Sequence, residues 1–143
     1  LRGRTWIAGF IFTRCPSTCP ALTARMRDLS ARLEDAGLDV TLVSISVDPM
    51  HDTPEVIARW AREQSLPTSR WLVLTGGVEA TRSLVRQGFL LALDDAAREN
   101  PEMLLHDTRL VLVDRELAVR GYYDSADPAR MNQLVEDARG LAR

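Results

Sequence analysis

Lysine is absent from this chain of 143 residues, and all 18 of its basic side chains are arginine. Chemistry that needs a lysine amine, such as Schiff-base formation, is therefore excluded. With 20 acidic residues the net charge is −2, a balance that does not favour a nucleic-acid binder. The sequence also lacks any run of 18 apolar residues, so no membrane-spanning helix is expected within it.

Cysteine is scarce as well, with only two residues, which cannot form the disulfide framework of a small secreted protein. Both lie in the segment FTRCPSTCP, as Cys15 and Cys19. Free cysteines are often just small buried apolar residues. Because both thiols of the chain occur together, we interpret them as a site of thiol chemistry instead.

The hydrophobic pattern predicts alternating strands and helices. The expected strands are Trp6 to Phe12, Val40 to Val47, Trp71 to Leu74, Arg109 to Val113 and Ala118 to Tyr123. The expected helices are Leu22 to Leu33, Asp52 to Gln64, Val78 to Arg86 and a last one that starts at Asp127-Pro128. Residues 89–105 have no clear period. The order predicts one α/β domain, a central mixed sheet with helices on both faces.

The cysteine pair follows the first expected strand, where the chain enters its first helix. Ligands of open α/β sheets bind at the carboxyl ends of the strands. A spacing of four residues places Cys15 and Cys19 on one side of a helical turn, and a helix N-terminus stabilises thiolates. A thiolate is both a redox nucleophile and a soft metal ligand, so the local pattern supports both uses.

His106, in LLHDTRLVLVD, is a candidate third ligand. A single histidine is more often an ordinary surface or core residue. In a thioredoxin-like sheet, however, the loop before the strand at Arg109 faces the first strand–helix junction. Two thiolates and one imidazole suit copper in both oxidation states, and zinc equally well. Asp107 could orient the ring or equally cap a turn, whereas His51 lies in a polar turn and is interpreted as a surface or capping residue.

Several segments together resemble the Sco/SenC family, copper-binding assembly factors of cytochrome c oxidase. They are FIFTRCPSTCP, SISVDPMHDTPE, LTG, LLHDTRLVLVD and RGYYD, spread over nearly the whole chain. The resemblance implies a thioredoxin-like domain over residues 1–143, without the family's N-terminal hairpin and anchor. It also implies copper binding by Cys15, Cys19 and His106, with Asp48 at an acidic position near the site.

The resemblance further implies a place and partners for the protein. The expected location is the periplasmic face of the bacterial inner membrane, with attachment through a segment absent from this chain. The expected client is subunit II of cytochrome c oxidase, at its dinuclear copper centre, or another copper enzyme. Other copper carriers are expected partners in copper exchange.

Two other functions use the same fold. In a thiol–disulfide oxidoreductase Cys15 would be the attacking thiolate, although the usual C-x-x-C spacing of such proteins is one residue shorter. A copper role and a reductase role can also be combined, because copper loading needs reduced thiols on both partners. A peroxide-reducing site would need Thr13, Arg14 and Arg109 around the thiolate, and this is the weakest of the three hypotheses.

Overall fold

The computed structural model describes residues 1–15, 18–67, 69–91 and 108–142. Its strands are β1 (Thr5–Ile11), β2 (Val40–Ser46), β3 (Trp71–Leu74), β4 (Arg109–Val113) and β5 (Val119–Asp124). Its helices are α1 (Thr18–Asp35), α2 (Pro54–Glu63), α3 (Val78–Ser83) with a π-helical turn η1 (Leu84–Gly88), and α4 (Pro128–Leu141). Each strand and helix predicted from the sequence is present, with ends that differ by a few residues.

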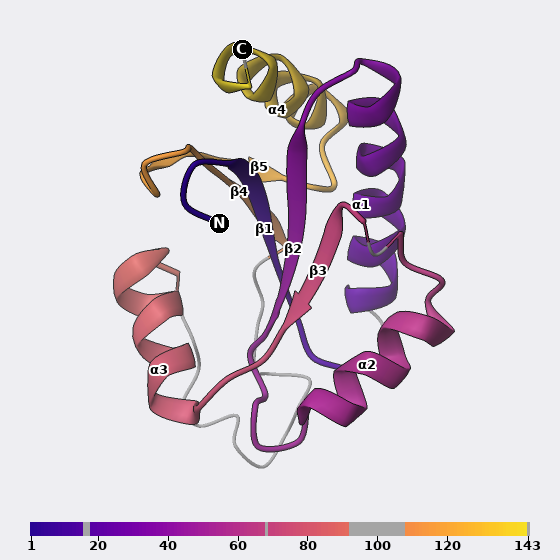
Figure 1. Ribbon diagram of the computed structural model, residues 1–143, viewed down its shortest axis with the longest axis vertical. Helices are drawn as coiled ribbons and strands as arrows, with labels where there is room; N and C mark the ends of the chain where they lie inside the picture. Colours follow the sequence, from indigo (N-terminus) through magenta and orange to yellow (C-terminus); the bar gives the residue numbers. More distant parts are fainter. Residues whose placement is uncertain (16–17, 68, 92–107, 143) are drawn as a thin grey trace.

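The five strands form one mixed sheet in the order β3-β2-β1-β4-β5. Strands β1, β2 and β3 are parallel neighbours, whereas β4 runs antiparallel to β1 and to β5. Helices α1 and α4 contact each other on one side of this sheet, and α3 lies on the other side (Figure 1). The α/β domain with a mixed sheet and helices on both faces is therefore confirmed.

The two central parallel strands carry the core. Every residue of β1 and β2 is buried, which explains why β1 reads as a nearly continuous apolar run, although β2 also buries Thr41, Ser44 and Ser46. Parallel pairing from Thr5 with Val40 to Ile11 with Ser46 brings the carboxyl ends of both strands to one edge. No helix among the described residues is long and apolar enough to cross a membrane.

Local capping signals define the ends of several helices. The side chain of Thr53 accepts a hydrogen bond from Val56 N–H at the start of α2, and that of Asp127 accepts from Ala129 N–H at the start of α4. Helix α1 ends at Asp35 and is followed by Gly37, whose φ of +66° is the left-handed conformation that favours glycine. These caps therefore fix where each of these helices begins or ends.

Gly9 in β1 allows α1 to approach the sheet closely. A Cβ atom at this position would lie 2.7 Å from Met26 Sδ and 3.2 Å from Leu110 Cδ2. Both neighbours are fully buried, so a larger side chain has to displace core atoms. We expect Gly9→Val to lower the free energy of unfolding by about 1–3 kcal/mol, measured by urea denaturation.

Gly140 in α4 offers a matched control, since a Cβ there would meet nothing within 4 Å. Gly140→Ala should raise the stability by up to about 1 kcal/mol through helix propensity. An equal change in the free energy of unfolding for the two substitutions would contradict the close approach at Gly9.

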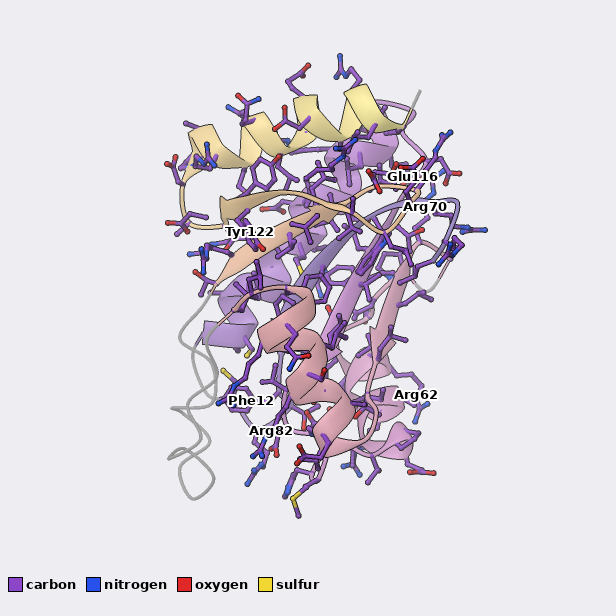
Figure 2. The ribbon with its side chains drawn as sticks, turned by 90° about the vertical axis from the view of Figure 1, so that its left-hand side faces the viewer. Phe12, Arg62, Arg70, Arg82, Glu116 and Tyr122 are labelled. Carbon is purple, nitrogen blue, oxygen red and sulfur yellow. The ribbon has the colours of Figure 1, made fainter. Side chains whose placement is uncertain are left out.

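The cysteine segment and the β4–β5 turn lie at opposite ends of the molecule. Figure 2 shows Phe12, which leads into Cys15, near one end, and Glu116 of the β4–β5 turn near the other. The candidate site therefore lies beyond the carboxyl end of β1, and the β4–β5 turn lies near the opposite end of that strand.

Candidate functional site

Cys15 is placed by a tight turn that follows β1. The turn is closed by a hydrogen bond from Cys15 N–H to the carbonyl oxygen of Phe12, at 3.1 Å. Phe12 is almost fully buried and anchors the turn in the core, while Cys15 itself is partly exposed. The sulfur thus lies at the rim of the sheet's carboxyl edge, where an incoming molecule can reach it.

Cys19 lies in the first turn of α1, and its backbone N–H donates a hydrogen bond to Cys15 Sγ at 3.2 Å. The first N–H groups of a helix have no partner within the helix, so the sulfur satisfies one of them. A sulfur that carries negative charge is a stronger acceptor than a neutral thiol. The structure therefore brings both cysteines together, as predicted, and both are free thiols.

The two thiols differ in exposure. Cys19 is buried, with 6% of its surface exposed. Burial raises the pKa of the Cys19 thiol well above its ordinary value, and the hydrogen bond with Cys15 adds to the rise. The protein therefore leaves Cys15 partly exposed and shields Cys19, whose neutral thiol form is favoured by burial.

Two carboxylates of the β2–α2 loop contact the cysteine turn. Asp48 accepts two hydrogen bonds from Arg14, from Nη2 at 2.6 Å and from Nε at 3.0 Å. Asp52 is fully buried and accepts from the backbone N–H of Thr13 at 3.0 Å. Asp48, the acidic residue predicted near the site, thus contacts the cysteine segment through its ion pair with Arg14.

Sequence reasoning missed the hydrogen bonds that Thr13 and Ser46 donate to Asp52. It treated Asp52 as part of a helix start, whereas the capping side chain is Thr53 and Asp52 points into the interior. One signal for this was available, because Ser46 is a polar residue in a strand that is buried throughout. A buried hydroxyl needs a hydrogen-bond partner, which indicates a polar residue nearby.

The predicted third ligand, His106, and its neighbour Asp107 lie outside the described residues. Within the described part of the chain, no three histidine, cysteine or acidic side chains gather as a metal site. His51 is exposed, and its backbone N–H donates to the carbonyl oxygen of Asp48. This agrees with its interpretation as a surface residue.

The groups that a peroxide-reducing site would require bind other partners. The Thr13 hydroxyl donates to Asp52, and the Arg14 guanidinium is paired with Asp48. Arg109 lies over the ring of Tyr122, 5.4 Å from its centroid. None of these three contacts is directed to a cysteine sulfur.

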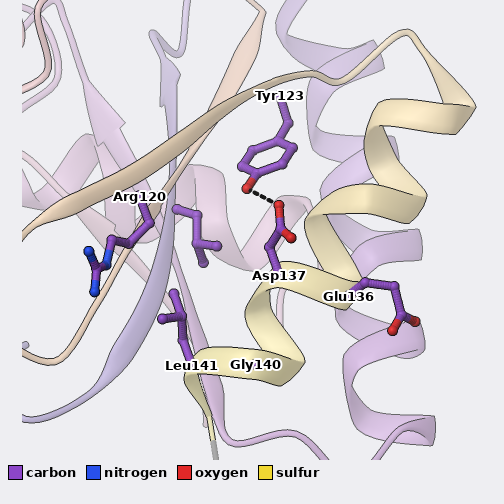
Figure 3. A pocket seen from close by; sticks show the side chains of 7 residues that line it. Arg120, Tyr123, Glu136, Asp137, Gly140 and Leu141 are labelled. Carbon is purple, nitrogen blue, oxygen red and sulfur yellow. Dashed lines mark hydrogen bonds between the residues drawn. The ribbon is translucent and has the colours of Figure 1, made fainter.

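A separate cavity of about 510 Å³ lies between β5 and α4 (Figure 3). Tyr123 donates a hydrogen bond to Asp137 across it, at 2.6 Å. The lining residue Leu112 pairs with Ile7, near the start of β1, whereas Cys15 follows the end of that strand. The cavity and the thiol pair are therefore distinct features of the fold.

Comparison with known proteins identifies the family. The SCO1/SenC family model matches residues 1–142. Among curated proteins, the SCO1 protein homolog of Bacillus subtilis is 31% identical over 145 aligned residues, which are 99% of this chain and 73% of that protein.

Solved structures agree with this match. A SCO1/SenC family lipoprotein from Bacillus anthracis is 32% identical with a TM-score of 0.89, over all of this chain and 84% of that one. A second structure, BsSco, is 27% identical with a TM-score of 0.84, over 99% of this chain and 81% of that one. BsSco is described with a disulfide switch and as a member of the Sco family of cytochrome c oxidase assembly proteins.

A third structure contains a metal. Arabidopsis thaliana ScoI with copper bound is 25% identical with a TM-score of 0.76, over 98% of this chain and 87% of that one. The match along the sequence, the shared mixed sheet and the two thiols at its edge all lead to one assignment: this chain belongs to the SCO1/SenC family.

Proposed function

We propose that this chain is a copper metallochaperone that holds copper through Cys15, Cys19 and His106. The observation that carries the proposal is the pair of free thiols at one strand–helix junction, joined by the bond from Cys19 N–H to Cys15 Sγ. Thiolate sulfur is the ligand type that Cu(I) prefers, and imidazole extends the set to Cu(II). The donor chemistry of the described residues therefore fits copper.

Two relatives support this proposal. Arabidopsis thaliana ScoI has been solved with copper bound, and BsSco belongs to a family of cytochrome c oxidase assembly proteins. We infer that the client is the dinuclear copper centre in subunit II of cytochrome c oxidase, or the site of another copper enzyme. Other copper carriers would supply the metal.

The unequal exposure of the thiols suggests an order for copper transfer. Cys15 is accessible at the rim, whereas Cys19 is buried. An incoming client thiolate would therefore replace Cys15 first and Cys19 last, so that copper always keeps a sulfur ligand. We place this exchange on the periplasmic face of the bacterial inner membrane, consistent with the lipoprotein found among the structural relatives.

A second function, thiol–disulfide exchange, is favoured by the same asymmetry. The Cys15 thiolate would attack one sulfur of an oxidised client, forming a mixed disulfide and releasing one client thiolate. Cys19 would lose its proton to solvent and attack Cys15 Sγ, which releases the second client thiolate. Two electrons pass to the client, and this chain is left with a Cys15–Cys19 disulfide.

Copper content measured against thiol content tests the main proposal. Anaerobically purified, reduced protein should bind one equivalent of Cu(I) and show two titratable thiols. After oxidation of the thiols to the disulfide, Cu(I) binding should disappear, because a disulfide offers no thiolate. Full Cu(I) binding by the oxidised protein would contradict a site built on these cysteines.

A further inference from the structure

The buried carboxylate of Asp52 connects the cysteine turn to the sheet. Its side chain is fully buried, although it lies in a loop between β2 and α2. Burial of a carboxylate is costly unless its oxygens are hydrogen-bonded. The bonds that Asp52 makes therefore identify the structure that it stabilises.

Three neutral donors point at the Asp52 carboxylate. The backbone N–H of Thr13 donates to Oδ2 at 3.0 Å, and the Thr13 hydroxyl donates to Oδ1 at 2.5 Å. The Ser46 hydroxyl, at the end of β2, donates to Oδ2 at 2.6 Å. One carboxylate thus bonds twice to the turn after β1 and once to the neighbouring strand.

Thr13 is the residue through which these bonds reach the thiol pair. It lies inside the turn from Phe12 to Cys15, and that turn places Cys15 Sγ against Cys19 N–H. A turn at the edge of a sheet can shift unless its inner N–H groups have partners. Asp52 supplies the partner for the N–H of Thr13 and also takes its hydroxyl.

The other contact between the two loops is weaker. The Arg14–Asp48 pair has an Arg14 side chain that is 37% exposed, and exposed ion pairs contribute little free energy. The Asp52 side chain is fully buried, and its bond from Ser46 is buried as well, whereas the two bonds from Thr13 are partly buried. Asp52 is therefore the stronger of the two links between the β2–α2 loop and the cysteine turn.

We propose that Asp52 is a positioning residue, which holds the Cys15 turn through Thr13 so that the two sulfurs are preorganised for thiol exchange and copper binding. The copper part of this inference rests on the proposed function, whereas the thiol part does not. Preorganised sulfurs form a disulfide more readily, because less freedom is lost on closure. Copper binding is favoured for the same reason, because less freedom of the two sulfurs is lost when they bind the metal.

The test uses the dithiol–disulfide equilibrium with glutathione, measured on the folded protein without copper. Asp52→Ala should lower the equilibrium constant for disulfide formation by about tenfold, because the turn loses its two bonds to the carboxylate and the sulfurs lose their alignment. Asp52→Asn keeps the shape of the side chain, and its carbonyl oxygen can still accept from Thr13 N–H and Ser46. It should stay within about threefold of the original protein.

Asp114 provides the matched control at the far end of the molecule. It too is a buried carboxylate that accepts backbone N–H bonds, from Glu116 and Ala118. Asp114→Ala should lower stability but leave the equilibrium with glutathione unchanged. If Asp52→Ala behaves in the same way, Asp52 is merely structural and the proposal is overturned.

A milder pair of variants covers the case in which Asp52→Ala does not fold. Thr13→Val removes only the hydroxyl bond to Asp52, and Thr13→Ser restores it. Thr13→Val should lower the disulfide equilibrium constant by about threefold, and Thr13→Ser should return it to the original value. Identical values for both variants would overturn the proposal.

Cu(I) titration of the same proteins separates this inference from the proposed function. If the original protein binds Cu(I), Asp52→Ala should lower the affinity by about 10–100-fold, as expected for a residue that orients a ligand. If the original protein binds no copper, the metallochaperone proposal fails while the thiol equilibrium still decides the role of Asp52.

Discussion

Replacing either Cys15 or Cys19 by alanine should lower the affinity for Cu(I) by about a thousandfold or more, equivalent to about 4 kcal/mol of binding free energy. Each thiolate is a soft ligand, and the structure brings these two cysteines together at the carboxyl edge of the sheet. Competition with a chromophoric Cu(I) chelator under anaerobic conditions measures the loss. The two variants should lose affinity to a similar extent.

Met50 is the control for this experiment, since it is an exposed sulfur-containing side chain in the β2–α2 loop. A thioether is also a soft copper ligand, so Met50→Ala tests whether any nearby sulfur would suffice. We expect no change in Cu(I) affinity for Met50→Ala. A loss as large as that of the cysteine variants would move the site away from the thiol pair.

The same single-cysteine variants report the difference between the two thiols. Because burial raises the pKa of Cys19, its thiol stays protonated through the neutral range. At pH 7 an alkylating reagent should therefore modify Cys15 in the Cys19→Ala variant much faster than it modifies Cys19 in the Cys15→Ala variant. Equal alkylation rates in the folded proteins would contradict the assignment of Cys15 as the accessible sulfur.

His106→Ala should weaken Cu(II) binding far more than Cu(I) binding. Imidazole suits Cu(II), whereas two thiolates already satisfy Cu(I). We expect the Cu(II) affinity to fall by about a hundredfold or more, or about 3 kcal/mol, and the thiolate-to-copper charge-transfer band to shift. Absorption spectroscopy during Cu(II) titration measures both changes, and an unaltered band and affinity would show that His106 is not a ligand.

His51 is the control for this experiment, because His51 and His106 are the only two histidines in the sequence. His51→Ala removes an exposed imidazole and should leave Cu(II) binding unchanged. A further difference is expected in the pH dependence, since a histidine ligand has to be neutral. Cu(II) affinity of the original protein should fall as the pH drops below about 6.5, and His106→Ala should lose that part of the dependence.

The fold was largely predictable because its signals are local. The buried strand β1 appears as a nearly continuous apolar run, and α2 and α4 begin at a capping residue followed by proline. Such patterns depend on neighbours within a few residues, which the sequence shows directly. The position of Cys15 and Cys19 at the end of β1 followed from the same local pattern.

Relations between segments were not predictable in the same way. The sequence pattern places the start of α2 at Asp52, and only packing makes Thr53 the cap and buries Asp52. Likewise, nothing in the order of residues shows that Arg14 pairs with Asp48. These contacts arise because parallel strands β1 and β2 bring the loops that follow them side by side.

By itself, then, the sequence determined the alternation of strands and helices, the place of the thiol pair and its resemblance to one family. Only the tertiary structure decided that Cys15 is accessible while Cys19 is buried, and that Asp52 holds the turn between them and β1. The physical reason is that exposure, pKa and buried hydrogen bonds depend on which atoms surround a side chain. Those atoms come from segments as far apart as Thr13 and Asp52, joined only by folding.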